Sequence, residues 1–81
     1  MSYQKIIIKE WEKKGYVVLK NIRLNKSGYP DLQCLKNGLT VWIEVKELKD
    51  TLKPLQKLRI DQLRANGFKA FCIQFDKGII Y

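Results

Sequence analysis

The chain has 81 residues, enough for one small domain, and we expect a single domain over residues 1–81. Its 46% hydrophobic content excludes a disordered chain, and its apolar runs are far too short to span a bilayer. Sixteen Lys and Arg against eight Asp and Glu give a net charge of +8, which indicates a polyanionic partner such as nucleic acid. No secretory signal pattern is present, so we expect a cytoplasmic protein with no membrane partner.

Two cysteines, Cys34 and Cys72, fall in segments that we expect to be strands. Because the chain has no histidine, a zinc site of the usual Cys/His type is close to excluded. We therefore predict that both thiols are reduced core residues. We expect no organic cofactor.

The first predicted helix covers residues 3–14, where apolar side chains recur at helical spacing. Glu10 falls on the apolar side of this helix, and a carboxylate there needs a partner. One interpretation is that Glu10 lies at the edge and reaches solvent or Lys14. The other is that it points across the sheet toward Asp31 and Glu44.

Residues 16–19 predict a short first strand, and residues 21–29 predict a polar loop. Within this loop, Gly28 is expected to supply either a turn conformation or a close backbone approach. Because the loop leads into Asp31, basic residues around it would lie near any site there and could contact phosphates; ordinary solvated charge is the alternative. These basic residues are Lys20, Arg23 and Lys26.

The stretch over residues 31–46 is predicted to be a hairpin around a central Asn-Gly pair, which favours a type I′ turn. A turn centred there pairs residues whose numbers sum to 75, so Asp31 lies opposite Glu44 with Cβ atoms about 5 Å apart. Lys46 projects from the same face as Glu44. Trp42 shares that face, and we expect it to be core under a covering helix rather than a base-stacking platform.

Two carboxylates beside a lysine on rigid strands suit a divalent cation. Mg²⁺ or Mn²⁺ is the expected cofactor, because Asp31 and Glu44 offer the oxygen ligands that these ions prefer. Like charges directly opposite each other destabilise a sheet, so we expect Mg²⁺ to raise thermal stability. The alternative is an ordinary solvated sheet face.

A second helix is predicted over residues 54–66, with Pro54 at its first position. Gln56 lies in its first turn, where a side-chain amide either caps the helix or binds a phosphate or water. Lys53, just before this helix, is a further candidate for DNA contact. Residues 68–75 predict a strand covered on both faces.

These elements predict an α/β fold in the order helix, three antiparallel strands, helix, strand. The expected architecture is a mixed four-stranded sheet flanked by helices, with a right-handed crossover through the second helix. The apolar tail over residues 78–81 either adds a short strand, docks on the core or joins a subunit interface.

Gly28-Tyr29-Pro30-Asp31, followed thirteen residues after Asp31 by Glu44-Val45-Lys46, resembles the Pro-Asp…(Asp/Glu)-x-Lys nuclease signature. The Gly-x-Pro-Asp form with a downstream Gln resembles the virus-type replication–repair nuclease family, VRR-NUC. This resemblance extends over about residues 10–75 and implies a restriction-endonuclease-like core.

The resemblance also implies site roles. Asp31, Glu44, Lys46 and Gln56 would be catalytic, and the cation would be held by Asp31, Glu44 and the Val45 carbonyl, with Glu10 beside it. Lys46 would orient the attacking water or stabilise developing charge.

The function implied is a metal-dependent, structure-specific DNA endonuclease. A homodimer resolving four-way (Holliday) junctions is its most concrete version, and a stand-alone nuclease this short resembles a bacteriophage product. The alternatives are a non-catalytic nucleic-acid-binding module and a small assembly subunit with an incidental charged face.

Overall fold

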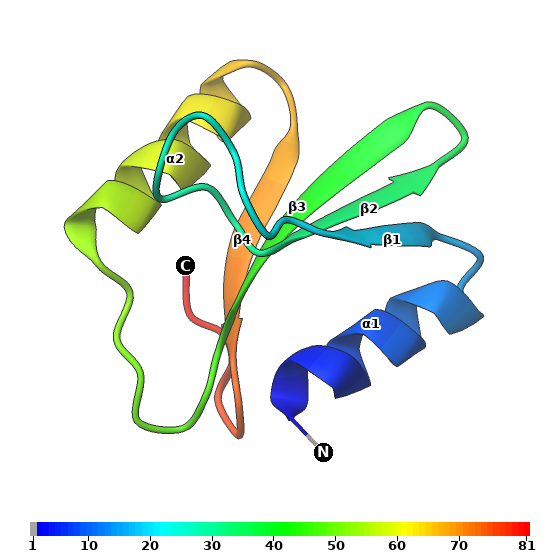
Figure 1. The fold of residues 1–81 in the computed structure, drawn as a ribbon, viewed down its shortest axis with the longest axis horizontal. Helices are drawn as coiled ribbons and strands as arrows, with labels where there is room; N and C mark the ends of the chain where they lie inside the picture. Colours follow the sequence, from blue (N-terminus) through cyan, green and yellow to red (C-terminus); the bar gives the residue numbers. More distant parts are fainter. Residues whose placement is uncertain (1) are drawn as a thin grey trace.

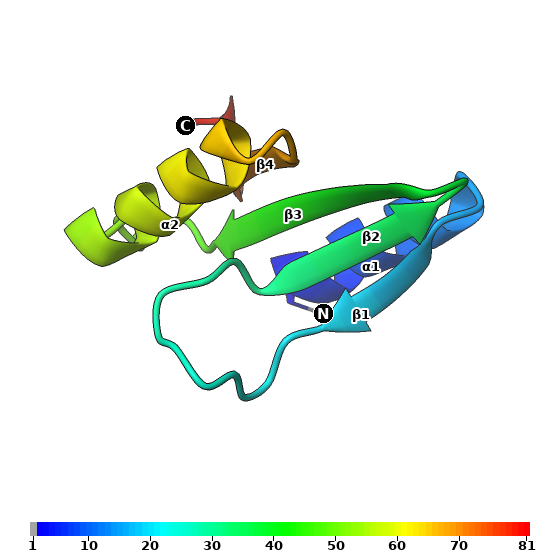
Figure 2. The same cartoon turned by 90° about the horizontal axis from the view of Figure 1, so that it is seen from above.

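In the part of the chain that the structure describes, a single sheet of five strands, which neighbour one another in chain order, forms the centre of the fold. The structure is a computed structural model, and it describes residues 2–81. The elements are α1 (Tyr3–Lys13), β1 (Val17–Lys20), β2 (Leu32–Lys36), β3 (Leu39–Lys46), α2 (Pro54–Ala65), β4 (Lys69–Gln74) and β5 (Gly78–Ile79). The two helices lie on opposite sides of the sheet (Figures 1 and 2).

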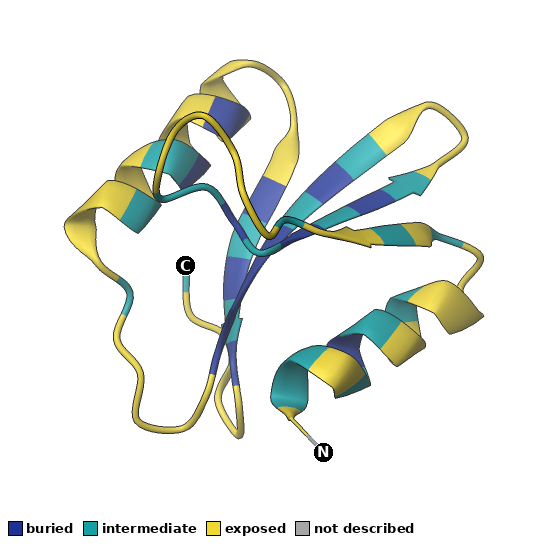
Figure 3. Cartoon of the chain, viewed as in Figure 1, coloured by how far each residue is buried: buried dark blue, intermediate teal, exposed yellow. Residues whose placement is uncertain are grey.

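Each helix covers its own hydrophobic cluster. Under α1, Ile7 packs against buried residues of β2 and β3 such as Leu32 and Ile43. Under α2, Ile60 packs with Ala70 and its neighbours of β4. Strands β3 and β4 are therefore covered on both faces of the sheet, as the burial colours in Figure 3 indicate.

Alternation along β3 determines which side chains meet which helix. Val41, Ile43 and Val45 belong to the cluster under α1, whereas Trp42 packs in the cluster under α2. Trp42 is therefore partly buried core, as predicted. Its indole N–H is buried without a hydrogen-bond acceptor in the part of the chain that the structure describes.

The hairpin has the predicted register. Strands β2 and β3 pair antiparallel from Leu32 with Ile43 to Lys36 with Leu39, and each pair sums to 75. Both turn residues have positive φ, 51° at Asn37 and 77° at Gly38. These values confirm the prediction from the Asn-Gly pair, because a type I′ turn needs positive φ at both positions.

The α/β fold class is confirmed, but the sheet has one strand more than the predicted four. Strands β3 and β4 are parallel and joined through α2, as expected. The additional strand, β5, pairs antiparallel with β4 through Ile73 with Ile79 and Gln74 with Gly78. The apolar tail thus extends the sheet, one of the three outcomes considered for it.

Both cysteines are free and buried, as predicted. Burial raises the pKa of each thiol, Cys34 and Cys72, to about 11. Among residues 2–81, no helix has the length and apolar character needed to cross a membrane.

Candidate active site

Glu44 is a carboxylate in the interior of the sheet. It lies on β3 beside Cys72 of β4, and only 3% of its surface is exposed. Lys46, two residues further along the same strand, is 8% exposed, and its Nζ lies 3.7 Å from Oε2 of Glu44. Side chains two residues apart on a strand share a face. The predicted placement of Glu44 and Lys46 on one face is therefore confirmed.

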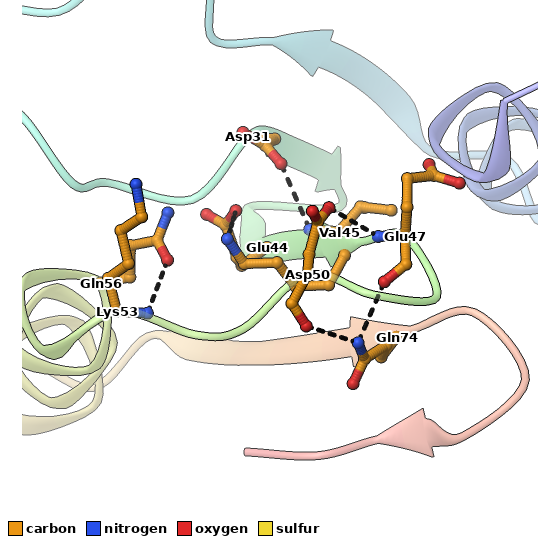
Figure 4. Close-up of polar contacts among 9 residues, drawn as sticks. Asp31, Glu44, Val45, Glu47, Asp50, Lys53, Gln56 and Gln74 are labelled. Carbon is orange, nitrogen blue, oxygen red and sulfur yellow. Dashed lines mark hydrogen bonds and ion pairs between the residues drawn. The ribbon is translucent and has the colours of Figure 1, made fainter.

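Asp31 stands directly before β2 and faces β3. Its Oδ2 accepts a hydrogen bond of 3.3 Å from the backbone N–H of Val45 (Figure 4). Its own carbonyl accepts a hydrogen bond of 2.7 Å from the N–H of Asn21. These two bonds hold Asp31 beside Glu44 although it lies just outside the paired strand.

The electrostatics of Glu44 follow from this position. Burial, and after it the negative charge of Asp31, raise the pKa of the Glu44 carboxyl to about 8, whereas Lys46 acts in the opposite direction. A buried charge is costly unless it is paired. One lysine therefore does not compensate the two acids, and the pair favours additional positive charge.

A backbone oxygen belongs to the same site. Within a strand, the N–H and C=O of a residue face the same neighbour, so the Val45 carbonyl lies on the Asp31 side like its N–H. Continuing the β2–β3 register by two residues beyond Leu32 and Ile43 places Pro30 opposite Val45. Because Pro30 has no N–H, it cannot donate the ladder hydrogen bond to this carbonyl.

The donor set fits a hard divalent cation. Carboxylate oxygens of Asp31 and Glu44, with the Val45 carbonyl on the same side, are oxygen ligands of the type that Mg²⁺ and Mn²⁺ take in proteins. The raised pKa of Glu44 points the same way, because a bound cation would favour the ionised form that burial and Asp31 disfavour. Within residues 2–81, no group of three or more His, Cys, Asp or Glu gathers at one place.

Comparisons with known proteins agree with this geometry. The family model described as VRR-NUC domain matches residues 3–75. The chain belongs to the VRR-NUC family. No sequence among curated proteins matches it.

Solved structures resemble this VRR-NUC chain. A structure described as a VRR_NUC domain is 30% identical with a TM-score of 0.74, over 85% of this chain and 76% of the other. The Holliday junction resolvase Hjc of Archaeoglobus fulgidus is 19% identical with a TM-score of 0.64, over 86% of this chain and 64% of its own. The restriction-endonuclease-like fold implied by the sequence is thus confirmed, and the chain is a nuclease of this family.

Glu10 does not join the VRR-NUC acids in this structure. It is exposed on α1, and its charge lies close enough to Tyr3 to raise the pKa of that phenol, after burial as the larger cause. Helix α1 covers the sheet face opposite to the one that carries Trp42 and, two residues on, Glu44. The interpretation in which Glu10 points toward Asp31 and Glu44 is therefore not what the structure describes.

Gln56 has the capping role that was one of its two interpretations. Its Oε1 accepts a hydrogen bond of 2.9 Å from the backbone N–H of Lys53, in the first turn of α2. Figure 4 draws both residues beside the Asp31–Glu44 pair. This bond leaves the amide nitrogen and the second lone pair of the oxygen free for a catalytic contact.

The four candidate DNA-contacting residues are all exposed. Lys20 ends β1, and Lys53 is the N-cap of α2. Arg23 and Lys26 lie in the loop between β1 and β2 that leads into Asp31. Their distribution around the acidic pair is consistent with contacts to a nucleic-acid backbone.

Sequence reasoning did not single out two residues that support segments beside the site. Arg59 donates a hydrogen bond to Ser27 in the loop before Asp31, and Gln74 supports the segment after Lys46. The Gln74 amide nitrogen donates to the carbonyls of Glu47, Leu48 and Asp50, directly after Lys46, at 3.0, 3.2 and 2.7 Å. Figure 4 shows the bonds to Glu47 and Asp50. Gln74 is only 4% exposed. A glutamine at an inward position of an otherwise apolar strand was the available signal.

Proposed function

We propose that this VRR-NUC chain is a metal-dependent, structure-specific endonuclease that hydrolyses phosphodiester bonds in branched DNA. The observation that supports it most is the Asp31–Glu44 pair, in which a buried acid lies beside a second acid with one lysine 3.7 Å away. Such an arrangement is destabilising by itself, so it suggests a functional site. The net charge of +8 supports a polyanionic substrate.

Each residue has a role in this chemistry. Asp31, Glu44 and the Val45 carbonyl would hold Mg²⁺ or Mn²⁺, because all present oxygen atoms on one side of β3. When bound, the ion supplies Lewis acidity at the phosphoryl oxygen and lowers the pKa of a coordinated water. The Val45 N–H fixes the Asp31 carboxylate in place before substrate arrives.

Lys46 would act on the reacting phosphate. Its Nζ is held near Glu44 by an ion pair and by burial, so little reorganisation is needed when negative charge develops. A positively charged group at this position can orient a water molecule or stabilise the pentacovalent phosphate. The exposed Lys20, Arg23, Lys26 and Lys53 would contact backbone phosphates and position the strand.

We further propose a homodimer acting on four-way junctions. Two identical sites related by a two-fold axis would suit a symmetric junction. Fold likeness to a Holliday junction resolvase supports this substrate.

The decisive variant is Asp31→Asn, which keeps the size of the side chain and its hydrogen-bond acceptor but removes the charge. We expect cleavage of branched DNA to fall by at least about 100-fold, as for loss of a main electrostatic contribution to catalysis. Binding, measured by fluorescence anisotropy at several salt concentrations, should persist. Cleavage at an undiminished rate would exclude Asp31 from the site, and a non-catalytic binding module would instead show salt-sensitive binding without cleavage by either protein.

A further inference from the structure

The loop between β1 and β2 carries a large apolar side chain in open solvent. Ile22 is 87% exposed, the most exposed of the large hydrophobic residues, and Leu24 on the same loop is 45% exposed. The loop arches around a hollow of about 370 Å³ lined by its own residues. Figure 2 shows it extending from the sheet, and Figure 3 shows it exposed over residues 22–27.

Hydrogen bonds hold the base of this loop at the acidic pair. The Asn21 N–H donates to the Asp31 carbonyl at 2.7 Å, and the Asn21 side chain donates to the Pro30 carbonyl at 2.9 Å. The Gln33 amide donates to Asn21 Oδ1 at 3.0 Å. Ile22 therefore follows directly on a residue that is fixed against the site.

The far side of the loop is fixed on α2. Arg59 Nε donates to the Ser27 carbonyl at 2.9 Å, and its guanidinium lies 4.9 Å from the centre of the Tyr29 ring. A Cβ on Gly28 would lie 2.7 Å from Leu55 Cγ, so the backbone packs closely there. Both ends of the loop are thus anchored, and residues 22–26 project between the anchors.

The charges on this loop identify its partner. Arg23 and Lys26 are exposed beside Ile22, and Lys20 precedes it at the end of β1. A contact between two copies of this loop would bring these positive charges together, which disfavours a second copy as the occupant. Positive charge around an apolar side chain suits DNA, because phosphates meet the charges while the apolar group reaches the bases.

We propose that Ile22 inserts between bases at the branch point of the DNA substrate, with Arg23 and Lys26 on the adjoining phosphates. This inference rests on the proposed function. Isoleucine is among the apolar side chains that separate base steps. Stacking is already interrupted at a branch, so insertion costs less there than in a continuous duplex. Ile22 would thereby favour branched over linear DNA.

The test uses a four-way junction with 2-aminopurine next to the branch, in Mg²⁺, with the Asp31→Asn chain so that cutting is slowed during the binding measurement. Four proteins are compared: Asp31→Asn alone, and the same chain with Ile22→Ser, Ile22→Leu or Leu39→Ser. Leu39 is a matched control, since it is 64% exposed but begins β3, at the opposite end of the strand from Glu44 and Lys46.

We expect 2-aminopurine fluorescence to rise when Asp31→Asn binds and the rise to be lost with Ile22→Ser. Junction affinity should fall about tenfold with duplex affinity changed by less than about twofold, as expected for losing one buried aliphatic contact. Ile22→Leu should restore both properties, and Leu39→Ser should leave them unchanged.

Retention of the fluorescence rise and of junction preference by Ile22→Ser would overturn the inference. Equal weakening of junction and duplex binding would overturn it as well, and so would a changed oligomeric state in size-exclusion chromatography, which would assign Ile22 to a subunit contact. Cleavage by the wild-type chain is measured separately: its absence alongside a normal fluorescence response would reject the nuclease proposal and leave the insertion supported.

Discussion

Glu44 is the residue whose environment is most unusual for its chemistry. It is buried on a central strand, beside Asp31 and 3.7 Å from Lys46. Ordinary folding gives no reason to place a second acid there, because like charges at cross-strand positions are unfavourable. The account therefore predicts a titration that differs from that of a surface glutamate.

Without metal, the free energy of unfolding should depend on pH because of Glu44. The pKa of Glu44 is about 8 in the folded protein, above the ordinary glutamate value, so the folded state binds more protons than the unfolded state between the two. Stability should therefore fall as pH rises from about 5 to about 8. Melting in EDTA across this range measures it.

Glu44→Gln is the matched control for this titration. It should flatten the decline, because the side chain no longer loses a proton. Added Mg²⁺ should raise the melting temperature of the wild type, and by more at pH 8 than at pH 5, since the ionised carboxylate is the ligand. A melting temperature of the wild type that is independent of pH in EDTA would contradict the assigned environment.

At the residue scale, the sequence predicted the pair but not its surroundings. Register arithmetic from one Asn-Gly turn placed Asp31 against Glu44, because a hairpin turn determines every cross-strand pair. The helical wheel placed Glu10 on an apolar side of its helix, but the helix covers the other face of the sheet. Helical periodicity alone contains no information about which sheet face a helix covers.

Among the elements, the loop between β1 and β2 depends on Gly28 for two separate reasons. Its φ is +85°, and an added Cβ would meet Leu55 Cγ at 2.7 Å. Gly67 has a similar φ of +87° with no atom within 4 Å of an added Cβ. Comparing the two glycines therefore separates backbone strain from steric clash. Gly28 supplies both the turn conformation and the close backbone approach that the sequence suggested as alternatives.

We predict that Gly28→Ala costs more stability than Gly67→Ala. Left-handed backbone strain should lower the free energy of unfolding by about 1–2 kcal/mol in both, and the clash should add about 1–3 kcal/mol at Gly28. Urea unfolding measures both variants. Equal losses would show that Leu55 moves aside without cost.

The segment after β3 depends on Gln74, whose amide nitrogen reaches three backbone carbonyls. Gln74→Leu should lower the free energy of unfolding by about 1–2 kcal/mol, because the hydrogen bonds are lost. Hydrogen exchange should speed up at the Glu47 and Asp50 amides, which bond within that segment.

Gln62→Leu serves as the comparison for this variant, because Gln62 is exposed on α2. It should leave the exchange of the Glu47 and Asp50 amides unchanged. Unaltered exchange in Gln74→Leu would mean that the segment holds its shape without the glutamine.

Alternation and turn signals predicted β2, β3 and β4, each of which has buried residues. The largely exposed β1 was indicated instead by its short run of β-branched and apolar residues. Strand β5 was left open because it is only two residues long, too short for any periodicity. It forms through a turn with positive φ at Asp76 and Gly78, which no strong dipeptide signal marks. Hydrogen bonds from Gln74 and Arg59 to distant carbonyls arise only when the chain is folded, so local sequence gives little indication of them.

Taken as a whole, the molecule is strongly positive but carries one pair of neighbouring acids, Asp31 and Glu44. The net charge of +8 attracts DNA, whereas Asp31 and, once it is ionised, Glu44 repel DNA unless a cation is bound between them. In the proposed function, metal binding and catalysis are thus coupled at a single place.

The most direct test is cleavage of an end-labelled four-way junction and a matched linear duplex, with Mg²⁺, Mn²⁺ or EDTA, by the wild type and by Glu44→Ala. We predict paired cuts in the junction only, which require metal and are lost in Glu44→Ala. Junction binding without cleavage in either metal, or cleavage that survives in EDTA or in Glu44→Ala, would contradict it.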